Sequence, residues 1–237
     1  MNWIIAGPDL VRKNTIGSIR RAELSRAAFE AVVEYGLRRT TFEKVGELAG
    51  VSKGVVLHHF RDKSSLLEAV FRRSNSLLSG AVIELYRHAE TPYERLWAIV
   101  FANFFPAIFN RRVCAAWVSL IAEVPHSREC QRVQAACNQR IKTNLQHELK
   151  HILPTDEVED AAQHLGLLID GIWVRAGLLL SANSDNAISE MEFAILKILP
   201  DDPASLSKHK QARAKIQGVA DILLGSNAYR EKIREAS

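Results

Sequence analysis

TTFEKVGELAGVSKGVVLHHFRDK, residues 40–63, contains the most informative local pattern of the chain. In its first half the apolar residues recur every three or four positions, and Thr41 can cap the start of a short helix with its hydroxyl oxygen. A glycine ends this helix, and Ser52 can cap a second short helix that runs from Lys53 to Phe60. Two short helices joined by such a turn predict a helix-turn-helix, whose second helix can enter the major groove of DNA.

The glycines of this stretch fit two helices that cross steeply. Such helices need a small residue where their backbones meet, and Gly46 and Gly50 supply that space. The spacing turns Val51, Val56 and Phe60 inward. Helix-turn-helix hairpins also occur as purely structural corners, so the spacing alone leaves both DNA binding and a structural role open.

The amino-acid sequence of this segment also resembles that of a known family. AGVSKGVVLHHFRDKSSLL, residues 49–67, resembles the signature of the tetracycline-repressor (TetR) family of bacterial transcription regulators. In that family a Gly-Val-Ser turn, a short recognition helix that ends in an aromatic residue, and a Lys before the next long helix recur together. The resemblance implies a DNA-binding regulator of a palindromic operator, with no enzymatic activity and no cofactor.

The recognition helix and the residues around it are the candidates for DNA contact. Such a helix offers few side chains to base edges, while its surroundings hold phosphates. For Arg20 and Arg21, at the start of the first helix, the alternative is that they are only solvated charges. The candidate residues are Arg20, Arg21, Thr41, Lys44, Ser52, Lys53, Gly54, Val55, Leu57, His58 and Lys63.

Two positions of the recognition helix depart from the common pattern of the family, which has Thr and Tyr where Val55 and Leu57 stand. The missing Tyr hydroxyl puts one usual phosphate contact in doubt, while Val55 can still meet a thymine methyl group. His58 and His59 are adjacent, and neighbours on a helix diverge by about 100°, so they cannot chelate one metal ion well. We expect one of them to face DNA and the other to pack.

The basic residues gather at the end of the chain that carries this motif. The whole chain of 237 residues has a formal net charge of +4. Residues 1–64 contain 11 Lys and Arg against 7 Asp and Glu, whereas residues 65–200 contain 13 against 15. This distribution fits an N-terminal part that meets a phosphate backbone and a middle part that does not.

Cysteine content and hydropathy predict a reduced, cytoplasmic protein. The three cysteines, Cys114, Cys130 and Cys137, are odd in number and form no C-x-x-C pair. The N-terminus has no basic region before its short apolar run, which speaks against a signal peptide. The longest apolar stretch, residues 165–180, is interrupted by charges and is expected to be a buried helix and not a membrane span.

Helical periodicity without competing strand alternation predicts an all-α fold. The expected organisation is a flexible leader at residues 1–17, a three-helix DNA-binding domain at 18–64, an effector-binding and dimerisation domain at 65–200, and a C-terminal extension at 201–237. The first helix is expected at residues 19–34, and a long helix follows Lys63. The later helices are expected at residues 92–105, 111–123, 130–153, 155–180, 189–199 and 206–224.

Three segments of the second domain sharpen the resemblance: NFF at 103–105, AAWVSLIAE at 115–123 and LLIDGIWVRAGLLL at 167–180. They resemble the branch of the family that represses the choline and glycine-betaine pathway. The resemblance implies choline or a related quaternary amine as effector, which needs aromatic faces and a carboxylate nearby because it has no hydrogen to donate. The candidate residues are Trp97, Phe101, Asn103, Phe104, Phe105, Trp117 and Trp173, with Phe109 as a further ring and Glu123 or Asp170 as the charge.

Two alternatives to a choline site stay open. Each of these aromatic residues can be a core residue only. A regulator of the same type can also serve another pathway and bind another small apolar or cationic ligand.

Dimerisation follows from the way DNA is read. One helix-turn-helix reads few bases, and a two-fold dimer doubles the contacts on a palindrome. The helices expected at 157–180 and 189–199 would pack against their copies as a four-helix bundle, with Gly166, Ala176 and Gly177 allowing close approach. An effector between the middle helices would then move the long helix behind the DNA-binding domain and release the operator, as in a repressor.

A rival motif, HELKH at residues 147–151, matches the H-E-x-x-H signature of zinc hydrolases. On a helix its two His share a face and could bind zinc, with Glu148 as the base and His164 as a third ligand. The motif lies one turn before Pro154, at a polar helix end where the TetR family carries charged residues and no metal site. We therefore expect no metal site, and a scaffold protein that does not bind DNA remains the alternative from another class.

Overall fold

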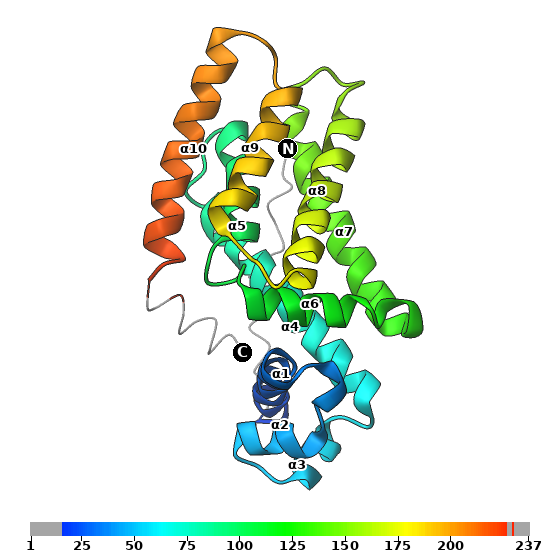
Figure 1. The fold of residues 1–237 in the computed structure, drawn as a ribbon. Helices are drawn as coiled ribbons and strands as arrows, with labels where there is room; N and C mark the ends of the chain where they lie inside the picture. Colours follow the sequence, from blue (N-terminus) through cyan, green and yellow to red (C-terminus); the bar gives the residue numbers. More distant parts are fainter. Residues whose placement is uncertain (1–15, 227–228, 230–237) are drawn as a thin grey trace.

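Every regular element is a helix within residues 16–226 and residue 229, the part that this computed structural model describes (Figure 1). The helices are α1 (Ile16–Tyr35), η1 (Leu37–Arg39), α2 (Phe42–Ala49), α3 (Lys53–His59), α4 (Lys63–Tyr86), α5 (Pro92–Phe104), α6 (Arg111–Ile121), η2 (Val124–His126), α7 (Arg128–Leu149), α8 (Val158–Leu178), α9 (Ser184–Ile198) and α10 (Pro203–Leu223). The predicted all-α class is confirmed.

The helices divide into a small head, made of α1, α2 and α3, and a larger body (Figure 1). α4 starts beside the head and runs into the body, where it packs against α5 and α7. α5 also packs against α9 and α10, and α8 packs against α6, α7 and α9. α6 crosses the base of the body and contacts α1. α4 and α6 are therefore the main helices through which the head meets the body.

Local sequence signals explain where most helices begin. The side chains of Thr41, Asp62 and Thr91 each accept a hydrogen bond from a backbone N–H in the first turn of α2, α4 and α5. The Asp62 N–H donates in return to the Ser65 hydroxyl, which completes a capping box. Pro92 stands in the first turn of α5, where its missing N–H costs no hydrogen bond.

The starts of α1 and α8 differ from the prediction, as do those of α7, α9 and α10. α1 begins at Ile16, before the predicted boundary at residue 18, and residues 1–15 of the predicted leader lie outside the described residues. α8 begins at Val158 and not directly after Thr155, because the Glu157 N–H first donates to the Pro154 carbonyl in a turn. An acidic run after a threonine therefore marked the helix start only approximately.

One predicted cap and one further helix start are also corrected. The Ser52 side chain makes no capping hydrogen bond, and only its backbone carbonyl accepts from the Val55 N–H at 3.0 Å. α9 begins at Ser184 and not at residue 189, because the Asn183 side chain accepts from the Asn186 N–H at 2.9 Å. The helix therefore begins before its predicted start at residue 189.

The C-terminal extension contains the predicted helix, α10, which packs along α5. The Tyr93 and Ser205 hydroxyls lie 2.7 Å apart, and Lys215 donates to the Glu94 carboxylate at 2.9 Å. These contacts join the start and the middle of α10 to the start of α5. α10 is therefore part of the body.

Gly177 allows α8 to touch α6 inside the chain. A Cβ at this position would lie 2.6 Å from Cγ2 of Val118 and would overlap the Cys114 carbonyl oxygen. Ala176 is buried as well, whereas Gly166 has open space around it. The close approach predicted for Ala176 and Gly177 against a second copy is therefore corrected, since Gly177 makes it within one chain.

All three cysteines are free and buried. Burial raises the pKa of the Cys114 thiol to about 12, so this thiol stays protonated and unreactive. Among the described helices, none combines the length and the apolar character that crossing a bilayer requires.

Candidate nucleic-acid interface and effector core

The turn between α2 and α3 brings two backbones into contact. A Cβ on Gly46 would lie 2.7 Å from the Val51 carbonyl oxygen, and the Val51 N–H donates to the Gly46 carbonyl at 2.8 Å. Gly50 ends α2 with a φ of +66°, a left-handed conformation that side chains disfavour. The predicted close approach is confirmed at Gly46, whereas Gly50 has nothing within 4 Å of a Cβ and only ends α2.

α3 has one buried side and one open side. Val56 and Phe60 are buried in the core of the head, as predicted. The side chain of Leu57 is 41% exposed, so an apolar group faces solvent from the middle of the helix. The other exposed residues of α3 are Lys53, Gly54 and His58, with Val55 half-buried beside them.

Arg21 braces the recognition helix from behind. Its guanidinium donates to the His59 carbonyl and lies 4.4 Å from the centroid of the Phe60 ring. Arg20 pairs with Glu23 at 2.7 Å on the same helix. Arg21 therefore holds the end of α3 against α1, a positioning role that the sequence pattern did not indicate.

Lys53 is tied to the other helix of the hairpin. Its ammonium forms an ion pair with the Glu43 carboxylate of α2 at 2.5 Å, with both side chains about half exposed. The hydrogen bond from Lys53 holds the pKa of the Glu43 carboxyl below its usual value. A carboxylate therefore stands beside the most prominent cation of the predicted DNA-binding face.

The other two predicted lysines also have protein partners. The Lys44 ammonium lies 4.1 Å from the centroid of the Tyr35 ring. Lys63 donates to the Leu37 carbonyl at 3.0 Å, which links the start of α4 to η1. The hydroxyl oxygen of Thr41 accepts from the Lys44 N–H at 3.3 Å as the cap of α2.

The adjacent histidines at the end of α3 differ in environment. His58 is exposed and His59 is half-buried, with ring centroids 5.2 Å apart and nearly perpendicular planes. Desolvation, with help from His58 and Arg21, lowers the pKa of His59. One ring thus points outward and the other packs, as expected.

Five aromatic rings form a continuous chain through the body. Phe71 of α4 lies 5.3 Å from Trp117 of α6, measured between centroids, and Trp117 lies 6.1 Å from Trp173 of α8. Trp173 lies 5.3 Å from Phe109, which lies 5.2 Å from Phe104 of α5. The structure thus joins four of the predicted rings and adds Phe71, for which the only sequence signal is its position on the inner face of a long helix.

The other predicted aromatic residues lie on the side of α5 that faces α10. Trp97 is 5.4 Å from Phe101 and 5.3 Å from the ring of His209, a buried residue of α10. The Arg213 guanidinium lies 5.6 Å from the Trp97 ring. α5 therefore splits the predicted effector residues into two groups. Phe105 lies near the end of α10, where its ring is 3.6 Å from a Cβ built on Gly225.

The predicted polar partners lie apart from the chain of rings. Glu123, beyond the end of α6, lines a cavity of about 320 Å³. Lys63, the first residue of α4, lines the same cavity. Asp170 is exposed in a groove between α7 and α8. Buried Asn103 donates to the Ile99 carbonyl of its own helix at 2.8 Å. Neither pocket is lined by a residue of the chain of rings, and the role of Glu123 or Asp170 as the charge beside a ligand stays a prediction.

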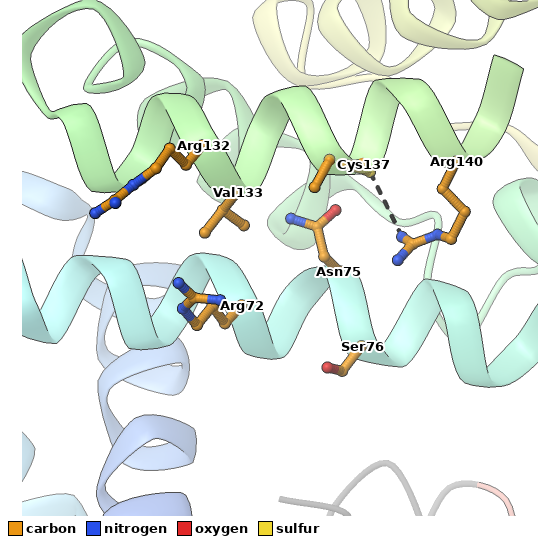
Figure 2. A pocket seen from close by; sticks show the side chains of 8 residues that line it. Arg72, Asn75, Ser76, Arg132, Val133, Cys137 and Arg140 are labelled. Carbon is orange, nitrogen blue, oxygen red and sulfur yellow. Dashed lines mark hydrogen bonds between the residues drawn. The ribbon is translucent and has the colours of Figure 1, made fainter. Parts of the chain in front are cut away.

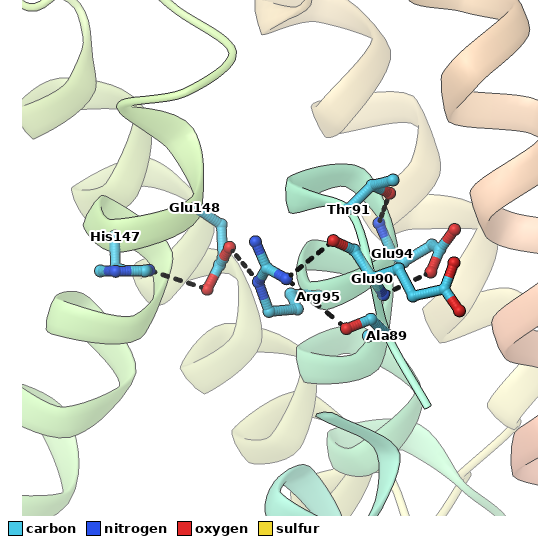
Figure 3. A network of polar contacts seen from close by, with 7 residues as sticks. All are labelled: Ala89, Glu90, Thr91, Glu94, Arg95, His147 and Glu148. Carbon is cyan, nitrogen blue, oxygen red and sulfur yellow. Dashed lines mark hydrogen bonds and ion pairs between the residues drawn. The ribbon is translucent and has the colours of Figure 1, made fainter. Parts of the chain in front are cut away.

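Glu148 of the H-E-x-x-H motif is a buried anchor, 1% exposed. One carboxylate oxygen accepts from Nε of Arg95 at 2.7 Å, and the other lies 3.0 Å from Nδ1 of His147 (Figure 3). Arg95 also donates to the Glu90 carbonyl at 3.2 Å. Glu148 thus ties α7 to α5, and the part of the chain described here holds no group of three His, Cys, Asp or Glu residues suited to a metal ion.

Comparisons with known proteins cover both the head and the body. Residues 24–70 match the model of bacterial regulatory proteins of the tetR family, and residues 92–199 match that of the C-terminal domain of BetI-type transcriptional repressors. The HTH-type transcriptional regulator BetI of Escherichia coli K12 is 37% identical over 164 residues, which cover 68% of this chain and 84% of that protein. BetI of Shigella flexneri serotype 5b matches to the same extent. α10 lies beyond both matched ranges.

Solved structures share the fold at lower identity. A transcriptional regulator from Rhodococcus sp. Rha1 is 24% identical with a TM-score of 0.66, over 75% of this chain and 95% of that chain. A regulator from Saccharomonospora viridis, solved in complex with choline, is 17% identical with a TM-score of 0.66, over 77% of this chain and 98% of that chain. With its α2–α3 hairpin and its match to BetI, the chain belongs to the TetR family of transcription regulators and carries a BetI-type C-terminal domain.

Proposed function

We propose that this regulator is a homodimeric repressor that reads a palindromic operator with α3 and releases it when a quaternary amine such as choline binds in the body. The observation that carries the DNA part is the open side of α3, where Lys53, Leu57 and His58 face solvent. In this proposal, these side chains and Val55 meet base edges and thymine methyl groups. The surrounding residues that would hold phosphates are Arg20, Thr41, Lys44, Ser52 and Lys63, with Gly54 allowing close approach and Arg21 positioning α3.

We assign DNA binding to the chain up to residue 64, and effector binding and dimerisation to residues 65–200. This division is supported by the position of α4, which leaves the head and enters the body. We assign α10 to the effector domain, because Lys215 and Ser205 join it to α5.

The dimer is supported by apolar side chains on α8 and α9. Phe193 is 63% exposed and Leu167 is 57% exposed, and Leu178, Leu179 and Leu196 are exposed on the same two helices. Large apolar side chains that gather on one face mark a contact surface. Pairing α8 and α9 with their copies buries these groups in a four-helix bundle.

Sedimentation of a Phe193→Glu variant tests the dimer. The introduced charge should give a monomer, and the loss of the second half-site contact should abolish tight operator binding. Ile222→Glu is the matched control, because Ile222 is 73% exposed but lies on α10. A dimeric Phe193→Glu variant would contradict this interface.

The effector site is placed at the chain of aromatic rings. A quaternary ammonium binds to ring faces, and Trp117 and Trp173 present theirs at 63° to each other. Phe71 belongs to α4, so a ligand that separates Phe71 from Trp117 also shifts the helix that carries the head. The similarity to BetI and to a fold solved with choline supports the choice of choline.

Titration calorimetry and operator gel shifts with choline test this assignment. Choline should bind and weaken operator binding, while 3,3-dimethylbutan-1-ol, which has the same shape without the charge, should bind at least about tenfold more weakly. Trp173→Leu should weaken choline binding by about tenfold or more, and Trp97→Leu, an equal change outside the chain of rings, should not. Equal binding of the neutral analogue would favour the alternative of a small apolar effector.

A further inference from the structure

A groove of about 520 Å³ lies between α4 and α7 (Figure 2). α4 contributes Arg72, Asn75 and Ser76, and α7 contributes Arg132 and Arg140. Three guanidinium groups therefore surround one opening. Such a cluster attracts anions, because each guanidinium offers several N–H donors to one oxyanion.

Two of these arginines are partly neutralised, and the third is not. Arg72 pairs with Glu68 at 2.8 Å, and Arg132 pairs with Glu129 at 3.3 Å. Arg140 has no carboxylate partner among the described residues and donates only to Sγ of Cys137 at 3.7 Å (Figure 2). Burial raises the pKa of the Cys137 thiol, so this neighbour stays neutral and leaves the charge of Arg140 unbalanced.

Asn75 supplies an unsatisfied acceptor in the same groove. Its side chain is 5% exposed and lies between the two helices (Figure 2). Nδ2 donates to the Phe71 carbonyl at 3.0 Å, which fixes the orientation of the amide, and Oδ1 has no hydrogen-bond partner. A buried acceptor without a donor destabilises the folded state, so the groove lacks a hydrogen-bond donor at this point.

We propose that this groove binds a small oxyanion that also carries an O–H group, of which hydrogen phosphate is the simplest. The O–H donates to Oδ1 of Asn75, and the charged oxygens accept from Arg140 and from the remaining donors of Arg72 and Arg132. An anion without a proton satisfies the arginines but leaves Asn75 unpaired. The groove shares no lining residue with the chain of rings, although Asn75 donates to the carbonyl of Phe71, which belongs to that chain.

The position of the groove gives such a ligand a structural consequence. Asn75 belongs to α4, the helix that starts beside the head, whereas Arg140 belongs to α7 in the body. An anion held by both joins the two helices in the arrangement of this structure. Bound anion should therefore raise the thermal stability of the whole chain, as for any ligand that binds only the folded state.

The test compares inorganic phosphate with sulfate on the full chain, by titration calorimetry and thermal unfolding at neutral pH. Phosphate carries an O–H at this pH and sulfate does not, so phosphate should bind at least about tenfold more tightly. Arg140→Gln, a surface change, should weaken phosphate binding by about tenfold or more. Arg128→Gln, at an exposed position of α7 that does not line the groove, should leave it unchanged.

Asn75→Leu separates the acceptor from the charge. It should remove the preference for phosphate over sulfate while leaving sulfate binding in place, because the arginines remain. If this variant does not fold, Arg140→Gln alone decides the matter. Equal phosphate binding by the wild type and Arg140→Gln would place the anion elsewhere, for example on the basic head, and would overturn the proposal. Sulfate binding as tight as phosphate binding, or no saturable phosphate binding, would overturn it as well.

Discussion

The head and the body each depend on one glycine that lets two backbones touch, but the two contacts differ in sequence distance. Gly46 meets the Val51 carbonyl within a single hairpin, where a Cβ would be 2.7 Å from that oxygen. Gly177 of α8 meets Val118 of α6, and η2 and α7 lie between these two helices along the chain. The head is thus specified by local signals, whereas the body is specified by contacts that only the folded chain creates.

This difference has a consequence for perturbation. Damage in the α2–α3 hairpin should remove DNA binding and leave the body folded, because α2 packs mainly on α1 and α3. Damage at the α6–α8 contact should reduce the stability of the whole chain, because α8 also packs against α7 and α9. Substitutions in the two regions can therefore separate them.

The largest effect is expected for Gly177→Ala. The new methyl group overlaps Cγ2 of Val118 and the Cys114 carbonyl, so α6 and α8 must move apart, at a cost of about 3 kcal/mol in the free energy of unfolding. Chemical denaturation followed by circular dichroism measures this loss. Gly80→Ala in α4 is the control, since nothing lies within 4 Å of a Cβ there, and it should be neutral or stabilise by up to about 1 kcal/mol. A stable Gly177→Ala protein would show that the α6–α8 contact can relax.

The next effect is expected for Gly46→Ala, at the matching contact of the head. A Cβ 2.7 Å from the Val51 carbonyl forces α3 away from α2, at a local cost of about 1–3 kcal/mol. Operator affinity in a gel shift should fall by at least about tenfold, because α3 no longer fits the groove in its proper orientation. The main unfolding transition of the body should keep its midpoint. A large shift of that midpoint would mean that the head and the body unfold as one unit.

The same contrast explains what could be predicted from the sequence. The hairpin was predictable down to Thr41, Gly46 and Gly50, because caps and glycine turns act within a few residues. Helix existence in the body was also predictable from periodicity. The start of α9 at Ser184 was not, since Asn183 reads equally well as a turn residue or as a cap.

The effector core was predictable only in part. Trp117 and Trp173 were singled out and do meet, but Trp97 faces α10 and Glu123 lines a cavity between the head and the body. The positions of both residues were missed for one reason. Composition identifies aromatic and acidic residues, while the side of a helix that each one occupies depends on packing partners far away in sequence. The role of Arg21 as a brace for Phe60 was unpredictable for the same reason.

A smaller effect concerns His209, where α10 meets the body. Burial lowers the pKa of this imidazole, while Glu192 opposes the shift and Arg213 and Lys210 add to it. The unfolded chain therefore takes up a proton near pH 6.5, but the folded chain does not until lower pH. Stability should be constant with respect to this group above about pH 6.5 and fall as the pH drops below it. Thermal unfolding between about pH 7 and pH 5 should depend less on pH for His209→Gln than for the wild type. The control His88→Gln, at an exposed position just beyond α4, should keep the pH dependence of the wild type.

The smallest effect is expected for Glu43→Gln in the head. Lys53 pairs with the Glu43 carboxylate, whose pKa is held low by this contact, so a negative charge stands next to the DNA-binding face at neutral pH. Removing the charge frees the Lys53 ammonium for the negatively charged DNA and should raise operator affinity by about twofold to fivefold, with a steeper dependence on salt. Glu47→Gln removes an equal charge from the exposed surface of α2 without freeing Lys53. It should therefore raise operator affinity by less than Glu43→Gln does and leave the salt slope unchanged. Equal effects of the two changes would mean that Lys53 stays paired on DNA and that recognition depends on Leu57 and His58 instead.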